Sequence, residues 1–387
     1  MSKFLHGVEV IEAQSGTRPI KTVKSSVIGV IGTAPSADPE KFPLNTPVLV
    51  AGKRAEAAPL GTEGTLPAAM DGIFDQAGAV VVVVRVDGAD EAAIMSNMVG
   101  GVAADGSYEG VQAFLGAESV LGVTPRILVA PGYAHQRPEG NRNPVITELV
   151  NVAERLRAVI IADGPNTNDE DAKAYRADFG SRRVFVVDPH VKVFRDGKTE
   201  VEPASARVAG MIAKSDNDRG FWWSPSNTNM NGIVATARPI DFQLGDANAR
   251  ANMLNEKEVS TIIRQNGFKL WGNRTCSDDP KWAFLSVVRT ADMINDSLLR
   301  AHMWAVDRNI TKTYIEDVTQ SVQSYLDSLK AQGAILGGQI WADEELNTPA
   351  NIQAGKVYFS FDFTPPTPAE HITFKSILTN NYLEEIV

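Results

Sequence analysis

The sequence has little cysteine, no long apolar run and no secretory signal, and each shortage excludes a class of protein. Its one cysteine, Cys276, cannot form an internal disulfide or a multi-cysteine metal site, and we expect it to be a packed thiol. The longest apolar run, residues 77–84, is too short to cross a bilayer. The first residues lack the apolar core of a signal peptide, so we expect a protein made and kept in the cytoplasm.

Excess positive charge is also missing. The formal net charge is −10, which argues against a general nucleic-acid binder, because neutralising phosphates requires lysine and arginine gathered on one face. With 43% hydrophobic and 22% charged residues the composition is that of an ordinary globular protein. A chain of 387 residues is long enough for two or three domains.

The motifs of common enzyme classes are absent or incomplete. The segment GVIGTA (29–34) lacks the third glycine of a dinucleotide-binding loop, and VAGKRAE (50–56) lacks the first glycine and the hydroxyl residue of a phosphate loop. No G-x-S-x-G elbow is present, and the five histidines are not spaced as metal ligands. Asp163 and Asp188 each follow an expected strand, where catalytic acids often lie, but the Gly and Pro beside them favour turns.

Strands and helices alternate through the first half of the chain. The run AVVVVVRV (79–86) is nearly all β-branched and does not alternate with polar residues, which is typical of a strand buried on both faces. We expect strands at 23–34, 47–52, 79–86, 126–132, 159–165 and 182–189, and helices at 66–78, 90–100, 109–122, 145–158, 168–180 and 204–215. Such an α/β order predicts a mostly parallel sheet with helices on both faces.

The pattern changes after residue 220. A loop-rich stretch leads to residues 255–275, and two long helices are expected at 282–306 and 314–333. A strand over 356–363 alternates, with Val357, Phe359, Phe361 and Phe363 on one face. We therefore expect a second, α+β unit and divide the chain into an amino-terminal arm (1–22), an α/β domain (23–275), an α+β domain (276–370) and a carboxyl-terminal arm (371–387).

Each end of the chain carries a short apolar segment without a neighbouring strand. Val8 and Val10 indicate a strand near the start, and Ile372, Phe374 and Ile377 indicate one near the end. A lone strand leaves a row of backbone N–H and C=O groups unpaired. We therefore expect another copy of the chain to supply the missing hydrogen bonds.

Two motifs carry a family resemblance. RVAGMIAKSDNDRGFWWSPSNTNMNGI (207–233) followed by FKLWGNRT (268–275) resembles the contractile tail sheath proteins of bacteriophages and R-type pyocins. The matching residues are Ala209–Gly210, Asp216, Arg219–Gly220, Ser224–Pro225–Ser226–Asn227, Gly232 and Trp271–Gly272–Asn273–Arg274–Thr275. The segment RILVAPGY (126–133) also resembles a strand and loop of this family, and FLHGVEV (4–10) and VIGVIGTAP (27–35) are similar to those of its P2-like branch.

The resemblance implies a structural role. Sheath subunits form a helical homopolymer of six-fold discs around a rigid tail tube, between a baseplate and a tail terminator protein, and the cylinder contracts to drive the tube through a bacterial envelope. It implies a virion tail, or a pyocin-like particle, assembled in the host cytoplasm. It implies no cofactor, no metal, no catalytic residue, and no nucleic-acid or membrane binding. It also implies a subtilisin-like, non-catalytic α/β domain and an inner carboxyl-terminal domain that faces the tube.

The resemblance also implies how copies are linked, since arms of this family complete a sheet in an adjacent subunit. The arm residues are then Val8, Val10, Ile11, Thr373, Phe374, Ile377, Leu378 and Tyr382, and the receiving sheet includes Val357, Phe359, Phe361 and Phe363. The linkers 14–19 and 364–370 are expected to act as hinges. Arg289, Asp292, Asp296 and Arg300 share a face of the first long helix and are either solvated or in contact with the tube or a neighbour.

The alternative is an enzyme: an α/β hydrolase-like or nucleotide-binding protein with a carboxyl-terminal interaction domain. That interpretation predicts a well-formed pocket near Gly132 or Asp163 into which polar groups converge.

Overall fold

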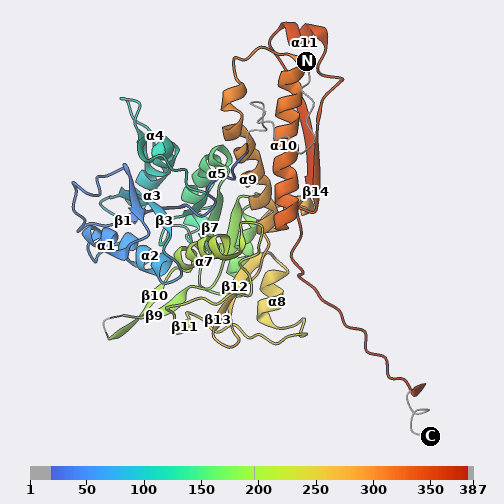
Figure 1. Ribbon diagram of the computed structural model, residues 1–387. Coiled ribbons are helices and arrows are strands. Elements are labelled where there is room, and N and C mark those ends of the chain that lie inside the picture. The colour runs from blue at the N-terminus through green and yellow to red at the C-terminus, as the bar shows by residue number, and fades with distance from the viewer. Residues whose placement is uncertain (1–18, 196, 382–387) are drawn as a thin grey trace, which may run out of the picture.

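An eight-stranded sheet lies at the centre of the protein (Figure 1). The computed structural model describes residues 19–195 and 197–381. The strands of the sheet, in spatial order, are β13 (Phe268–Trp271), β12 (Val259–Arg264), β8 (Val184–Val187), β7 (Val159–Asp163), β6 (Ile127–Val129), β1 (Ile28–Thr33), β3 (Val80–Val86) and β2 (Pro47–Ala51). The inner six are parallel and the two edge strands antiparallel, which confirms the expectation of a mostly parallel sheet.

Both faces of the sheet are covered, as the sequence of β3 predicts. Val81 and Val83 belong to one apolar core, and Val82 and Val84 belong to the core on the opposite face. The first core is completed by helices α2 (Thr65–Phe74) and α7 (Ser205–Arg219), and the second by α3 (Glu91–Val99), α5 (Pro144–Leu156) and α6 (Asp169–Ala177). A strand buried on both sides has no need of polar alternation.

Several shorter helices and strands lie around the eight-stranded sheet and its covering helices. They are α1 (Arg54–Ala57), η1 (Ala58–Leu60), β4 (Gly101–Val102), β5 (Tyr108–Glu109), η2 (Gly110–Gly116), α4 (Ala117–Leu121), η3 (Pro138–Gly140), β9 (Val191–Arg195), β10 (Lys198–Glu202), β11 (Ala235–Thr236), α8 (Arg250–Asn255) and η4 (Pro280–Trp282). The single helix expected over 109–122 is wrong: it is a 3₁₀ segment followed by a short helix. Gly110, the first residue of the 3₁₀ segment, has a φ of 58°, which lies outside the α-helical range.

The β12–β13 hairpin lies within residues 255–275, directly after the stretch that the sequence presents as loop-rich. Its turn contains Asn266 and Gly267, both with positive φ, which is the conformation that Asn-Gly turns supply to a tight hairpin. The hairpin extends the parallel sheet by β12 and closes its edge with the antiparallel β13.

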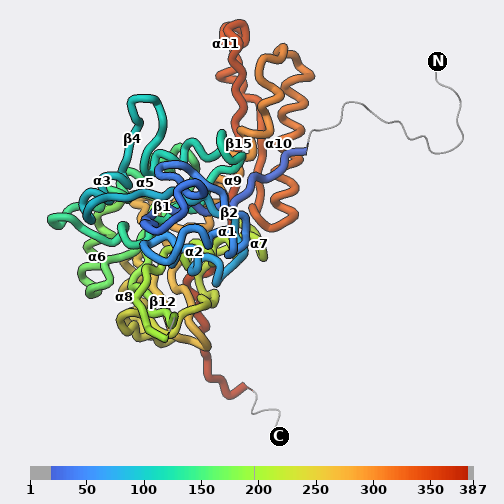
Figure 2. The backbone as a smooth tube through the Cα atoms, turned by 90° about the vertical axis from the view of Figure 1, so that its left-hand side faces the viewer, coloured from blue at the N-terminus to red at the C-terminus, as the bar shows by residue number. Residues whose placement is uncertain are grey.

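Two long helices and a hairpin follow. Helix α9 (Leu285–Ala301) and helix α10 (Lys312–Gln332) pack with β14 (Gly337–Ala342) and β15 (Phe359–Thr364), and the short elements η5 (Met303–Ala305) and α11 (Pro349–Gln353) lie in the connections. In Figures 1 and 2 these elements stand beside the eight-stranded sheet as an upright layer. The expected strand 356–363 is confirmed within a few residues, whereas β14 is an addition.

After Glu370, which pairs with Arg274, the chain runs away from the body as an extended tail (Figures 1 and 2). Residues 365–380 belong to no helix or strand. Among the described residues, no helix is both long and apolar enough to cross a membrane.

Candidate functional site

The carboxyl-terminal tail carries large apolar side chains that the other described residues leave uncovered. Phe374 is 93% exposed and Leu378 is 97% exposed, and Ile372 and Ile377 are 66% and 72% exposed. Thr373 is exposed as well. A row of exposed apolar side chains of this kind marks an interaction segment. The strand expected here does not form within one chain, because no described segment pairs with it; Tyr382 lies outside the described residues.

The root of this tail is held in place. Arg274 forms a bidentate ion pair with Glu370, with N–O distances of 2.6–3.1 Å. Between β15 and Glu370 the segment 364–370 contains three prolines, which lack the N–H group that a strand needs. The tail therefore leaves the body at a defined point and cannot simply prolong β15.

The amino-terminal end enters the body between the two long helices. The hydroxyl groups of Thr22 and Tyr325 lie 3.0 Å apart, and Val23 N donates to Ser297 Oγ at 3.0 Å. Tyr325 belongs to α10 and Ser297 to α9, so the chain passes between them before reaching β1 (Figure 2). The predicted arm residues Val8, Val10 and Ile11 lie outside the described residues.

The expected receiving sheet is the two-stranded β14–β15 hairpin. Phe359, Phe361 and Phe363 pack from β15 against a core made by α9 and α10, and the rings of Phe361 and Phe363 stack with centroids 6.0 Å apart. Val357 precedes the strand rather than belonging to it. An isolated two-stranded sheet is only marginally stable, so the helices behind this hairpin are what hold it.

The charged face expected on α9 is wrong for two of its four residues. Arg289 and Asp292 are buried, and each pairs with a residue of the same chain: Arg289 with Asp216 on α7 at 2.5 and 2.6 Å, and Asp292 with Arg183 ahead of β8. A contact with the tube or a neighbour is therefore not available to these two side chains.

The other two residues continue the same row of ion pairs. Asp296 binds Arg126, which precedes β6, and Arg300 binds Glu118 on α4 at 2.6 and 2.8 Å. Only Arg300 remains substantially exposed, at 42% of its side chain. Arg126 and Arg183 both come directly before parallel strands. Helix α9 therefore lies across the amino-terminal ends of these strands, and ion pairs hold it there.

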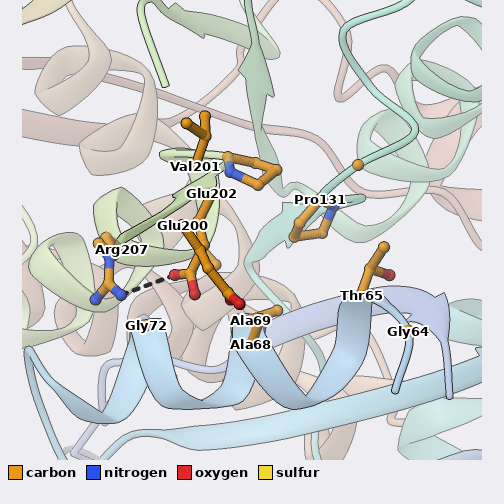
Figure 3. A pocket seen from close by; sticks show the side chains of 13 residues that line it. Gly64, Thr65, Ala68, Ala69, Gly72, Pro131, Glu200, Val201, Glu202 and Arg207 are labelled. Atoms are coloured by element: carbon orange, nitrogen blue, oxygen red, sulfur yellow. Dashed lines mark hydrogen bonds and ion pairs between the residues drawn. The ribbon is translucent and has the colours of Figure 1, made fainter. Parts of the chain in front are cut away.

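A small cavity of about 220 Å³ lies on the opposite side, at the carboxyl ends of the parallel strands (Figure 3). Thr65 and Gly132 line it together with Glu200, Glu202 and Arg207. Two of these charged groups pair with each other, since Arg207 donates to Glu202 at 2.9 Å, and Arg207 also donates to Asp75 at 2.7 Å. The pocket that the enzyme interpretation expects near Gly132 thus exists, but it is small.

Asp163 does not line that cavity. It is fully buried, and its carboxylate accepts hydrogen bonds from the backbone and hydroxyl of Ser205. Burial raises the pKa of Asp163 to about 6 in spite of these bonds. Nearby, the rings of His135 and His190 meet edge to face at 5.2 Å, a contact that their separation in the sequence conceals. In residues 19–195 and 197–381, no three His, Cys, Asp or Glu side chains could hold a metal ion.

The two halves of the recognised motif meet in space. Gly272 N donates to Ser226 Oγ at 3.0 Å, and Asn227 N donates to Leu270 O at 2.7 Å. Gly272 has a φ of 137°, and a Cβ there would lie 2.7 Å from Ser260 Cα. The motif is thus a packing device that fixes the 224–227 loop on β13, rather than a catalytic site.

Comparison with known families and proteins gives a consistent result. The models for the phage tail sheath protein central domain, the phage tail sheath C-terminal domain and the tail sheath protein Gp18 domain III N-terminal region match residues 106–276, 277–379 and 25–86. A prophage major tail sheath protein of Pseudomonas aeruginosa is 43% identical over 99% of both chains. The tail sheath protein of Escherichia phage P2 is 39% identical over 100% of this chain and 98% of its own length.

Solved structures show the same fold. The helical sheath of the anti-feeding prophage in its contracted state superposes with a TM-score of 0.74 at 20% identity, covering 96% of this chain and 99% of that one. The sheath of an extracellular contractile injection system, also contracted, gives 0.69 at 18% identity over 98% and 99% of the two chains.

Proposed function

This chain belongs to the phage tail sheath protein family, and on that premise we propose that its two ends are the links by which neighbouring copies hold one another. The protein is a structural subunit of a contractile tail sheath; it polymerises with its own kind, and it is not an enzyme. The enzyme alternative is thereby set aside. Its place is the tail of a phage or of a pyocin-like particle.

One observation carries the proposed linkage: the apolar side chains of the tail are exposed in a chain that also contains a two-stranded hairpin. Phe374 and Leu378 are exposed to solvent in the described part of the chain, where β15 pairs with β14 alone. A tail that pairs with the hairpin of another copy gains hydrogen bonds and buries its apolar residues in one step. Donor and acceptor surfaces differ, so such contacts build open helices rather than closed dimers.

The linkage has to survive contraction, and the hinge segments allow this. The proline-containing segment 364–370 and the segment 14–19 join the arms to the body. Within the body, α9 is tied to the sheet through the buried pairs of Arg289 and Asp292. We infer that each subunit turns as a rigid body while its strand pairing persists. The extended sheath would then be a trapped state of higher free energy that the baseplate releases, without nucleotide.

Finer assignments follow from the same premise. We propose that the α/β unit is subtilisin-like without catalytic residues, that residues 276–370 face the tail tube, and that a terminator protein closes the far end of the cylinder. We also propose that Arg300, with 42% of its side chain exposed, contacts the tube or a neighbour together with Asp296 beside it. Assembly in the bacterial cytoplasm belongs to this proposal as well.

Removal of residues 373–387 tests the linkage. The truncated chain should stay folded, because residues 373–381 are exposed to solvent. Negative-stain micrographs should nevertheless show separate globules instead of hollow cylinders. Cylinders of normal length from the truncated chain would contradict the proposal.

A further inference from the structure

The β14–β15 hairpin has two outer edges, and they are not equivalent. Asp343 N donates to Tyr358 O at 3.1 Å just beyond β14. In an antiparallel ladder, alternate residues turn their backbone groups towards the partner strand and away from it. By this alternation and the strand register, Gly338, Ile340 and Ala342 turn their backbone groups outward from β14. These outward groups are where a third strand would attach on that side.

Gln323 of α10 already occupies the outer edge of β14. Its Nε2 donates to Gly338 O at 3.2 Å, and its Oε1 accepts from Ile340 N at 3.3 Å. The second Nε2 hydrogen goes to Asp327 Oδ1 at 3.1 Å, which fixes the orientation of the amide. One carboxamide therefore makes both hydrogen bonds that one residue of a parallel neighbouring strand would make.

The outer edge of β15 has no such cover. By the same alternation Phe359, Phe361 and Phe363 turn their backbone N–H and C=O groups outward. Within the described part of the chain, no group beyond the hairpin hydrogen-bonds to them. Their side chains lie against the helical core, so the strand is held firmly while its edge stays free.

We propose that the hairpin accepts a guest strand on β15 only, that Gln323 closes the β14 edge against pairing, and that the first guest is the carboxyl-terminal tail (371–381) of another copy. The inference rests on the proposed function and adds the edge and the residue that selects it. The tail of the same chain is directed elsewhere by the Arg274–Glu370 pair (Figure 1). In a strand, Ile372, Phe374 and Leu378 share one face, which suits the apolar side of β15.

Disulfide trapping in assembled sheaths tests the edge. Ser360 on β15 and Gln339 on β14 lie on the face opposite Ile340, so a cysteine at either position is matched to the other. Neighbouring strands lie about 4.8 Å apart, and a disulfide needs Cα atoms within about 7 Å. Ser360→Cys is combined with Thr373→Cys, Lys375→Cys or Ile377→Cys in turn, and Gln339→Cys with the same three. The native Cys276 is fully buried and does not compete.

Oxidation should convert the monomer band into a ladder for a Ser360→Cys combination and for no Gln339→Cys combination. Ladders from Gln339→Cys alone would overturn the choice of edge while leaving arm exchange intact. Cylinders that assemble but give no ladder in either series would overturn the tail as guest, and the proposed linkage with it.

Gln323→Ala provides an independent variant that leaves β15 and the tail untouched. It should expose the β14 edge, so that Gln339→Cys now gives a ladder and the purified chain forms irregular aggregates. Gln320→Ala, an exposed glutamine one turn earlier, is the matched control and should behave like the native chain. Unchanged trapping at Gln339→Cys after Gln323→Ala would show that the amide does not guard the edge.

Discussion

Arg289 of α9 and Asp216 of α7 form a bidentate ion pair with N–O distances of 2.5 and 2.6 Å. Both side chains are almost completely buried. Arg289 also donates to Ser25 O at 3.0 Å, just ahead of β1. The pair thus joins the upright helical layer to the sheet at the point where the amino-terminal segment arrives.

Removing one partner of this pair should be far more damaging than removing both. Asp216→Leu leaves a buried guanidinium without its counter-charge, and we expect a loss of about 3–5 kcal/mol in the free energy of unfolding. Asp216→Leu combined with Arg289→Met should recover most of this loss. Urea denaturation of the unassembled chain measures both. Equal losses in the single and double variants would mean that the pair itself stabilises the junction.

Asp163 should make stability depend on pH in the direction opposite to an ordinary salt-bridged acid. Its pKa is about 6 in the folded chain, against an ordinary value of 3.8, because it is buried. The folded state favours the protonated form, so the stabilisation is present below pH 3.8 and is lost as pH rises through about 6.

The variant Asp163→Asn has no carboxyl proton to lose and stays neutral as pH rises. Relative to this variant, the native chain should lose about 3 kcal/mol of unfolding free energy between about pH 4 and about pH 7. Denaturant titrations of the two unassembled chains across this range provide the comparison. Parallel pH curves would contradict the assignment.

Phe374→Asp should separate folding from assembly. The side chain is 93% exposed, so the unfolding free energy of the unassembled chain should change by less than about 0.5 kcal/mol. In the sheath, the same change places a charge in an apolar contact, and cylinder formation should fail. Sedimentation and thermal melting together report the two effects. Lys375→Ala, whose side chain points to the other face of the strand, is the control and should still assemble.

Gly272→Ala should destabilise the chain by about 3 kcal/mol. The positive φ costs about 1–2 kcal/mol for any residue with a Cβ, and the backbone of Ser260 stands in the way of the added atom. Gly333 has a φ of 79° but open space around it, so Gly333→Ala should cost only about 1 kcal/mol. Similar melting temperatures for the two variants would show that the Ser260 contact is unimportant.

Local patterns in the sequence predict the α/β core well. The uninterrupted valines of β3 predict a strand buried on both faces, and the spacing of apolar residues in α5 and α10 predicts helices. β14 escapes prediction because it begins with two glycines, which weaken any strand signal. Gly110 has a φ of 58° and lies close to the backbone of Met98, and neither feature can be read from the residue pattern that predicts a single helix over 109–122.

The site is harder to predict because its partners are distant in the chain. The sequence pattern predicts that Asp292 lies on the surface of its helix. In the structure it is buried and paired with Arg183, which lies 109 residues earlier in the chain. The amide of Gln323 looks like any exposed polar residue, and only the position of β14 gives it a role. The exposed tail, by contrast, is predicted from the sequence, because its apolar residues lack any neighbouring segment to pair with.

A reconstruction of the assembled sheath tests the central claim most directly. The account predicts that residues 371–381 of each subunit run into a neighbour and lie as a strand beside its β15, with Gln323 still bonded to β14. A map in which that segment folds back onto its own subunit, and every sheet edge is completed from within one chain, would contradict it.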